Sequence, residues 1–482
     1  MATHTATRPV PASTAADPRR WLILAVIAAA QLMVVLDLTV MNLALPSAQH
    51  ALHFTAADRQ WVVTAYALSF GSLLLFCGRL ADLMGRKATF LTGLVGFAVA
   101  SAVGGAADSF STLVTARASQ GVFAALLAPS ALSLLATTFK DPKERAKAFG
   151  VYGMVAAAGG GLGLLLGGAL TTYLSWRWCM YINLVFAAVA IVGGALLLGR
   201  QERTPGGRLD VPGVVAVSGG MFCLVYGFAN AASHSWGTPS TWGFLLAGAA
   251  LLVAFAARQA RAAHPLLPPR VVLDRNRAGA YLTVLTSGAA TFGVFLFLVY
   301  YMQETLGYSA IRSGFAMLPM VVFSGAMANV GNTKLLPRFG PKPIVIAGML
   351  LNAAGMVWLT RIDAHSAYAS ALLGPLAVVG AGMGLVFGMV AATGTFGVGP
   401  RDAGVASASI NTGQQLGGSI GTALLNTIAA SAATAYLTDH PQAAQLAAVH
   451  SYTTVFWWCA GLFATGALVC GALLRRGPLG RG

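Results

Sequence analysis

The chain has 482 residues, of which 57% are hydrophobic and only 9% carry a charge. A soluble protein of this length needs far more charge to cover its surface, so the composition excludes one and indicates an integral membrane protein. The formal net charge of +16 does not indicate nucleic acid, because the cations lie in the connections between apolar runs and mostly on one side of them.

Fourteen apolar segments follow one another along the chain. Each has about 17–30 residues, enough to cross ~30 Å of hydrocarbon as a helix. The segments lie approximately at 21–45, 61–78, 88–107, 112–138, 146–170, 178–199, 211–231, 241–257, 278–301, 313–332, 343–360, 370–396, 403–432 and 453–474. The sequence thus predicts an all-α membrane protein with 14 transmembrane helices and polar tails at 1–20 and 475–482. The longest connections, 258–277 and 433–452, leave no room for a soluble catalytic domain.

The cations are divided unevenly between the two sides of the predicted spans. Of the 30 lysines and arginines, 25 fall on the side that holds both termini, four fall on the opposite side, and Arg117 lies within a span. Cytoplasmic connections are enriched in lysine and arginine. We therefore expect a multi-pass protein of the cell membrane with both termini in the cytoplasm.

The sequence contains no motif for metal binding or for nucleotide binding. The five cysteines are scattered and have no metal-ligand spacing, which favours inert thiols over a metal site. No loop of the GxxxxGK type is present to hold the phosphates of a nucleotide. We expect no metal, no cofactor and no enzymatic activity.

An internal repeat indicates how the spans are grouped. Residues 150–170 match residues 404–424 at 8 of 21 positions with an offset of 254. Residues 78–93 match residues 333–348 at four positions, three of them glycine or lysine, with an offset of 255. Chance pairing of glycines is the alternative, but two agreeing offsets make it improbable. The repeat predicts two six-helix halves, 21–199 and 278–474, separated by two inserted helices and a linker at 200–277, the design of paired-repeat transporters.

The motifs resemble those of one family of transporters. "GRLADLMGRK" (78–87) resembles the loop between spans 2 and 3 of the major facilitator superfamily, and "RASQG" (117–121) resembles its span-4 pattern. Similarity to the 14-span drug:proton antiporters is carried by "LDLTVMNLALP" (36–46), the span-5 glycines, "SWRW" (175–178), "DVPG" (210–213), "HPLLP" (264–268) and "LGYSAIRSG" (306–314). Leu83 and Leu164 depart from the pattern, where a basic residue and a proline are usual. The resemblance implies a major facilitator fold, arranged 6+2+6, and drug:proton antiport.

Two charges inside the first half are the candidate proton-coupling site. Asp37 is the only acidic residue and Arg117 the only basic residue that lies well inside the first six spans. The helical rise places both at similar depth in the same half. A buried carboxylate near an arginine can load and release a proton as solvent access changes sides. The family motif adds Gln120 to this site. The alternative is a static pair that only holds helices together.

The candidate gating residues come from the loop motif and the glycine motif. The loop motif contributes Gly78, Asp82, Gly85, Arg86 and Lys87, which the resemblance places at a cytoplasmic gate between the halves; the alternative is a tight turn between helices. The glycine motif contributes Gly150, Gly159, Gly163, Gly167 and Gly168, which we expect where the halves approach each other closely; the alternative is plain helix packing.

The candidate substrate contacts are aromatic and neutral polar side chains in the spans. They are Tyr66, Phe292, Tyr300, Gln303, Asn411, Gln414 and Gln415, with Phe295 and Tyr301 nearby. The aromatic residues of span 9 could instead face lipid or form the interfacial belt. Because spans 9 to 14 hold no acidic residue, we expect neutral, monocationic or weakly acidic amphipathic compounds as substrates.

Three functions are compatible with these patterns. We expect a proton-coupled exporter of antibiotics or other amphipathic molecules, either a multidrug transporter or one dedicated to self-resistance against a single natural product. The first alternative is a symporter that imports a small nutrient on the same fold. The second is a membrane enzyme or receptor, which would need a polar cluster or an extra domain. The expected partners are a small-molecule substrate, protons and membrane lipid, without nucleic acid, and the expected functional unit is a monomer.

Overall fold

The computed structural model describes residues 18–55, 58–139, 141–199, 210–234, 236–262, 267, 269–396, 398, 403–475 and 477. Within these residues all regular secondary structure is helical. Fourteen helices have 19 residues or more, and twelve of them are long and apolar enough to cross a membrane. The other two are α2, whose apolar segment Trp61–Leu74 is shorter, and α5. Helices suit this composition because each one satisfies its own backbone hydrogen bonds in lipid.

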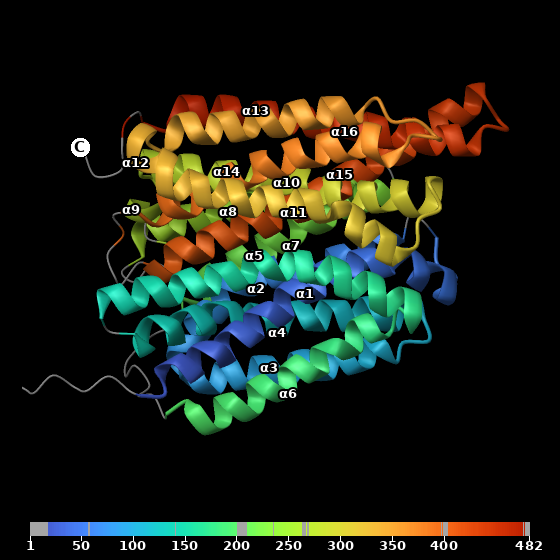
Figure 1. Cartoon of the computed structure of the whole chain (residues 1–482). Helices are drawn as coiled ribbons and strands as arrows, with labels where there is room; N and C mark the ends of the chain where they lie inside the picture. The colour runs from blue at the N-terminus through green and yellow to red at the C-terminus, as the bar shows by residue number, and fades with distance from the viewer. Residues whose placement is uncertain are drawn as a thin grey trace, which may run out of the picture.

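The helices form two bundles that lie side by side (Figure 1). The N half contains α1 (Arg20–Leu52), α2 (Arg59–Met84), α3 (Arg86–Gly105), α4 (Phe110–Thr138), α5 (Pro142–Tyr173) and α6 (Trp178–Leu197). The C half contains α10 (Arg275–Tyr300), α11 (Ala310–Val330), α12 (Leu336–Phe339), α13 (Pro341–Leu359), α14 (Leu373–Thr395), α15 (Ala403–Asp439) and α16 (Ala444–Leu473). Three wide π-helical turns adjoin helices of the C half. The turn η1 (Tyr301–Thr305) extends α10, η2 (Gly331–Leu335) extends α11, and η3 (Tyr368–Leu372) precedes α14.

The first helix begins and the last helix ends at the same end of the bundle, on the left in Figure 1. We call this the terminal end, and the other the opposite end. At the opposite end α15 and α16 extend past the other helices (Figure 1). The 37 residues of α15 rise about 55 Å, more than a bilayer core requires. The expected connection 433–452 is therefore largely helical, with only 440–443 between α15 and α16, and the expected connection 258–277 contains the short helix α9 (Pro269–Val272).

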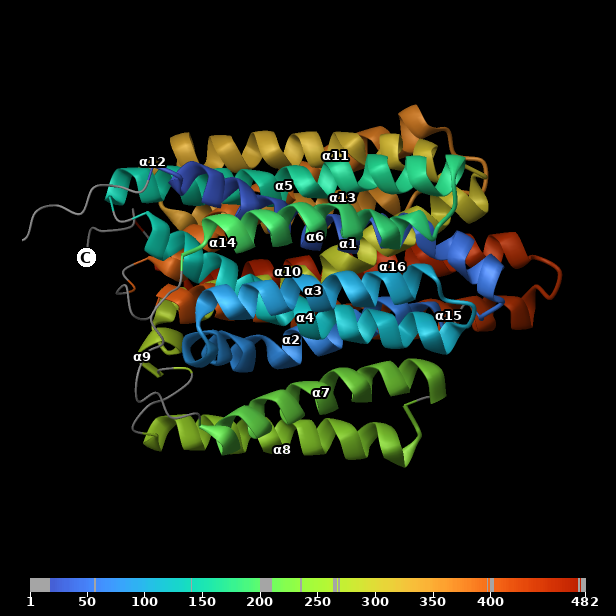
Figure 2. The same cartoon turned by 90° about the horizontal axis from the view of Figure 1, so that it is seen from below.

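The two inserted helices form a hairpin that covers one side of the junction between the halves. Figure 2 shows α7 (Val211–His234) and α8 (Pro239–Arg261) below the bundle, with α7 nearer to it. Helix α7 packs on α2 of the N half and on α15 of the C half. On α2, the Ser218 hydroxyl donates to the Ser72 carbonyl at 2.7 Å, and the rings of Tyr226 and Trp61 are 5.7 Å apart.

The internal repeat has a direct structural counterpart at the terminal end. Gly85 separates α2 from α3 with φ 92°, and Gly340 separates α12 from α13 with φ 73°. Both backbones lie where glycine is favoured, because a side chain there clashes with the main chain. The lysines two residues later also behave alike: Lys87 donates to Ala195 O at the end of α6, and Lys342 to Gly471 O near the end of α16. The matched residues therefore perform matched structural tasks in the two halves.

The apolar core joins the halves at one end more than at the other. One cluster of buried apolar residues links Leu36 and its neighbours up to Ala48 in α1, together with Leu164 in α5, to helices of the C half. A second cluster, which begins at Ile23 near the start of α1, contains N-half residues alone. The part of α1 that approaches the opposite end therefore shares a buried apolar cluster with the C half, in addition to the packing of α5 on α11 and of α2 on α15.

Candidate proton-coupling site

The predicted proximity of Asp37 and Arg117 is confirmed. Helices α1 and α4 bring them together so that Arg117 NH1 lies 2.5 Å from Asp37 Oδ2, and each side chain is only 1% exposed. The guanidinium is held from two further directions. Its Nε donates to the Val62 carbonyl of α2 at 3.2 Å, and its NH1 also donates to Gln120 Oε1 at 2.9 Å.

The second carboxylate oxygen of Asp37 accepts two hydrogen bonds from amides. Gln120 Nε2 donates to Asp37 Oδ1 at 2.9 Å, and Asn183 Nδ2 donates to the same oxygen at 2.7 Å. Ser101 Oγ lies behind them, 2.8 Å from Gln120 Nε2 and 3.4 Å from Asn183 Nδ2. The carboxylate is thus enclosed by polar groups from α3, α4 and α6, as expected for a charge that would otherwise be costly to bury.

Sequence reasoning included Gln120 but missed Asn183 and Ser101. Asn183 is a polar residue within an apolar span, Ser101 shares its span with Thr89 and Thr92, and neither belongs to the motifs described above. A search for polar side chains inside apolar spans would have included both, although it would have selected other residues as well. Only the packing of α3 and α6 against α4 and α1 identifies them as neighbours of Asp37.

Tyr66 also belongs to this site. Its ring lies under Arg117, with the guanidinium carbon 4.6 Å from the ring centroid, a cation–π contact. The ring is fully buried, and within the described residues its hydroxyl has no hydrogen-bond partner. The predicted role in substrate binding stays a prediction, but the contact that the structure provides is with the arginine of the ion pair.

This arrangement is suited to a change of protonation. A buried ion pair gains little net stability, yet removal of one partner leaves an uncompensated charge that costs about 3–5 kcal/mol. Protonation of Asp37 would have a similar effect on Arg117, since the guanidinium would lose its counter-charge. Its remaining contacts are the Val62 carbonyl, the Gln120 amide oxygen and the Tyr66 ring. Arg117 therefore depends on Asp37 for the compensation of its buried charge.

The span-5 glycines serve two different contacts, which corrects the expectation that they all lie where the halves meet. Gly159, Gly163 and Gly167 face α1 of their own half, and a Cβ on Gly167 would lie 2.8 Å from Val40 Cα. Gly168 faces the C half instead, and its Cβ would lie 2.6 Å from Ile311 Cα in α11. Because successive residues on a helix point about 100° apart, one glycine motif can serve both neighbours.

The candidate gate at the terminal end is only partly described. The side chain of Asp82 and the surroundings of Gly150 lie outside the part of the chain that the structure describes. Gly85 forms the turn already noted, and Arg86 is the first residue of α3. A Cβ on Gly78 would make an ordinary contact with Pro129 at 3.6 Å. Lys87 is bound to α6 of its own half, so this lysine stabilises the N half in the conformation described.

The predicted substrate residues lie at several separate helix contacts. Gln303 donates to the Leu43 carbonyl at 3.3 Å, and Tyr300 lies close to the same end of α10. The others lie along the packing of α15: Phe292 faces Gly418, the backbone of Gln414 faces Gly288, and Cβ of Gln415 lies 3.6 Å from the Cβ position at Gly71 in α2. Asn411 is half-buried on α15. Of the neighbours, Phe295 is half-buried, and Tyr301 donates to the Asp363 carbonyl.

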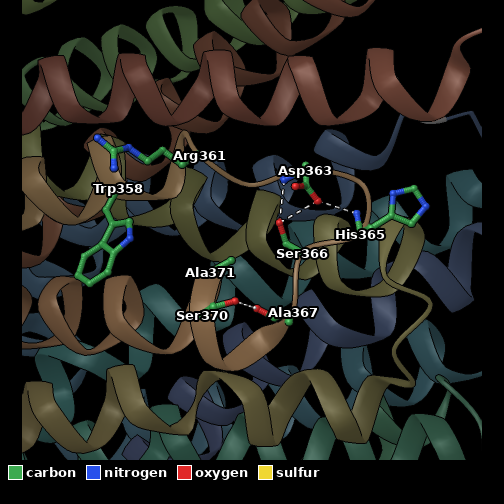
Figure 3. A pocket seen from close by; sticks show the side chains of 8 residues that line it. All are labelled: Trp358, Arg361, Asp363, His365, Ser366, Ala367, Ser370 and Ala371. Atoms are coloured by element: carbon green, nitrogen blue, oxygen red, sulfur yellow. Dashed lines mark hydrogen bonds between the residues drawn. The ribbon is translucent and has the colours of Figure 1, made fainter.

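A hollow of about 380 Å³ lies near the opposite end, but it belongs to the C half alone (Figure 3). Trp358 and Arg361 form one side, and Asp363 and His365 the other. Asp363 already accepts hydrogen bonds from the Ser366 hydroxyl at 3.1 Å and from the His365 backbone at 2.8 Å. Within the described residues no group of three histidine, cysteine, aspartate or glutamate side chains is placed to hold a metal ion.

The chain is similar to known proteins in sequence and in fold. The sequence pattern of the Major Facilitator Superfamily matches residues 27–422. The puromycin resistance protein pur8 of Streptomyces alboniger is 46% identical over 96% of this chain and 93% of its own length. The cephamycin export protein CmcT of Amycolatopsis lactamdurans is 38% identical over 83% of each chain. The crystal structure of an auto-inhibited peptide transporter of the POT family has a TM-score of 0.69 at 15% identity, covering 97% of this chain and 99% of that one.

Proposed function

Because this chain belongs to the major facilitator superfamily, whose members are transporters and not enzymes, we propose that it exports an antibiotic or a related amphipathic small molecule in exchange for protons. The observation that carries the proposal is the buried pair of Asp37 and Arg117. An ionisable residue inside a membrane span indicates a functional site, and carboxylates in such positions serve as proton relays in pumps and transporters. The export direction is supported by the relatives, which are named for resistance to puromycin and export of cephamycin.

The proposed cycle uses Asp37 in two charge states. A proton from outside binds the carboxylate, neutralises it and frees Arg117 from its counter-charge. The halves then rearrange, and Asp37 releases the proton to the cytoplasm and pairs with Arg117 again. Substrate and proton use the same conformational change in opposite directions, so the inward proton gradient drives the outward movement of substrate.

The proposed membrane arrangement has fourteen crossings, with α2 and α5 added to the twelve apolar helices. The bias of lysine and arginine puts the terminal end in the cytoplasm and the opposite end outside. We take the functional unit to be a monomer, with lipid around it and the hairpin of α7 and α8 covering one side of the junction.

The proposed substrate is amphipathic and carries at most one charge. Along the junction with α2, Gln415 is buried with its amide nitrogen unpaired among the described residues, and Thr412, one turn earlier, has an unpaired hydroxyl. Neutral hydrogen-bonding groups of this kind suit a polar part of a largely apolar molecule. A transporter for dications would instead need further buried carboxylates to balance the second charge.

The test is active efflux in a drug-sensitive bacterial host, with puromycin as the first probe and the empty vector as the control. We expect lower puromycin accumulation in cells that express the protein, and loss of this difference when an uncoupler collapses the proton gradient. Depletion of ATP with the gradient maintained should leave efflux intact. Efflux that needs ATP and survives the uncoupler would contradict the proposal, and proton-driven uptake would support the symporter instead.

A further inference from the structure

A second ion pair lies at the opposite end, away from Asp37. Arg59, the first residue of α2, places NH2 2.5 Å from Oε1 of Glu304 in η1. The guanidinium also lies over the Tyr300 ring, 4.4 Å from its centroid. The hydroxyl of Tyr452 in α16 donates to Glu304 Oε2 at 3.4 Å, and Arg59 Nε donates to the Gln49 amide oxygen of α1. The arginine side chain is only 9% exposed, against 33% for the glutamate.

This ion pair joins the two halves, because α2 belongs to the N half and η1 to the C half. Other contacts close the same end. Gln303 Nε2 donates to the Leu43 carbonyl at 3.3 Å, and the Ile311 backbone N–H donates to Thr172 Oγ1 at 3.3 Å. The remaining salt bridges described link residues within one half or within the hairpin. The pair of Arg59 and Glu304 is therefore a charged contact that must break if the halves separate at this end.

The same helix face also contacts the proton-coupling site. Arg59, Val62 and Tyr66 occupy positions i, i+3 and i+7 of α2, which lie on one side of a helix. Arg59 binds Glu304, the Val62 carbonyl accepts from Arg117, and the Tyr66 ring lies under Arg117. The first two turns of α2 thus connect the two ion pairs with no loop between them.

We propose that the pair of Arg59 and Glu304 is a clamp that holds the opposite end closed, and that the first two turns of α2 couple this clamp to the charge state of Asp37. The coupling part rests on the proposed function, whereas the clamp itself does not. When Asp37 is ionised, Arg117 is held by the carboxylate and anchors α2 through the Val62 carbonyl. Loss of the charge on Asp37 removes one of the two contacts by which Arg117 joins α1 to α2, so the charge state of Asp37 and the position of α2 against η1 depend on each other.

The two clamp residues differ in what the fold provides for them. Arg59 is almost fully covered and has Glu304, Tyr300 and Gln49 as partners, so its charge is well compensated only while the halves are together. Glu304 is more exposed and can be hydrated after separation. Breaking a charged contact of this kind costs free energy, but less than for a fully buried pair, because water reaches one partner. The clamp is therefore reversible on each cycle.

Cross-linking tests the clamp. Arg59→Cys and Glu304→Cys are introduced together after replacement of the five native cysteines by alanine or serine. We expect a disulfide that joins the halves, abolishes puromycin efflux and is reversed by reductant, while each single variant shows no reductant-sensitive block. Efflux at an undiminished rate by fully cross-linked protein would overturn the clamp.

Labelling gives a second measurement that does not depend on transport. Leu43 is fully buried, and its carbonyl accepts a hydrogen bond from Gln303, the neighbour of Glu304. Leu43→Cys therefore reports access from outside to a membrane-impermeant thiol reagent. Glu304→Gln should increase its labelling roughly three- to tenfold, the range expected for losing one partly buried charge pair. Arg312→Gln is the matched control, because Arg312 lies over Tyr308, 3.8 Å from the ring centroid, within the C half. Unchanged labelling in Glu304→Gln, or an equal increase in the control, would refute the clamp.

A separate measurement tests the connection between the clamp and the charge state of Asp37. Labelling of Leu43→Cys should change with the external pH, and this pH dependence should disappear in Asp37→Asn, where residue 37 cannot titrate. A pH dependence that persists in Asp37→Asn would refute the connection through α2. Failure of proton-driven efflux together with a functional cross-link would reject the proposed function and leave the clamp standing.

Discussion

Asp37→Asn is the substitution that separates proton carriage from structural support. The amide keeps the shape of the carboxylate but cannot be ionised. It offers one oxygen and one NH2 group where Asp37 accepts from Arg117, Gln120 and Asn183. At least one of these donors then loses its acceptor, and Arg117 loses its counter-charge at a site that is 1% exposed.

The expected effect on transport is large and can be given in free energy. An imposed gradient of one pH unit supplies about 1.4 kcal/mol for each proton, which sustains roughly a tenfold substrate gradient in one-to-one exchange. Without titration at residue 37 this driving force is not used, so the substrate gradient should fall to unity. The stability cost is bounded above by the roughly 3–5 kcal/mol for breaking a buried pair, and the neutral amide resembles the protonated state that the proposed cycle visits.

The assay uses proteoliposomes with an imposed pH gradient and puromycin as the probe, with rates expressed per correctly inserted molecule. Asp37→Asn should bind puromycin and exchange it across the membrane without accumulating it. Asp37→Glu is the matched control, because it keeps titration with displaced geometry and should retain part of the uphill activity. Accumulation by Asp37→Asn at the wild-type rate would refute the proton-carrier role and leave a purely structural pair.

Three further outcomes are expected. Gly168→Leu places a side chain against α11 of the other half, so uphill transport should fall at least tenfold while the amount of inserted protein changes little; normal transport would mean that this contact is not used. Lys87→Met and Lys342→Met each remove a charge-assisted hydrogen bond to a helix-end carbonyl, worth roughly 1.5–3 kcal/mol, and should lower the thermal unfolding temperature in detergent to similar extents if the halves are equivalent. Burial would raise the pKa of Asp210, but hydrogen bonds from Arg258 and the backbone outweigh it and lower the pKa from 3.8. The stabilisation of the hairpin by this carboxylate should therefore be present above pH 4 and lost as the pH falls through the lowered pKa, whereas Asp210→Asn should show no such loss in hydrogen exchange of α7.

Much of the architecture was predictable because membrane helices are constrained locally. A chain in lipid must satisfy its own backbone, so apolar runs of sufficient length become helices whatever their neighbours are. The repeat was also readable from residues, since a glycine that must adopt positive φ tolerates few replacements: Gly85 and Gly340 match in sequence and in conformation. The depth argument for Asp37 and Arg117 succeeded because the helical rise alone fixes how far each charge lies along its span.

Other features depended on which helix faces meet, and rotation about a helix axis is not encoded in hydropathy. Asn183 and Ser101 are polar residues inside apolar spans, and only the packing of α3 and α6 brings them to the site around Asp37. The glycines of α5 were predicted to lie between the halves, yet most face α1, because a one-residue step along a helix changes the neighbour.

Arg59 and Glu304 show the same limit most clearly. In the sequence they are charges just outside apolar segments, separated by more than two hundred residues and indistinguishable from ordinary loop charges. Pairing them required α2 to begin beside the end of α10, which depends on how the two halves come together. The sequence by itself therefore determined the helices, the repeat and the buried carboxylate of Asp37, since these follow from local chemistry. Only the tertiary structure decided which residues complete that site and which charges join the halves, because those contacts are set by packing between segments that are distant in the chain.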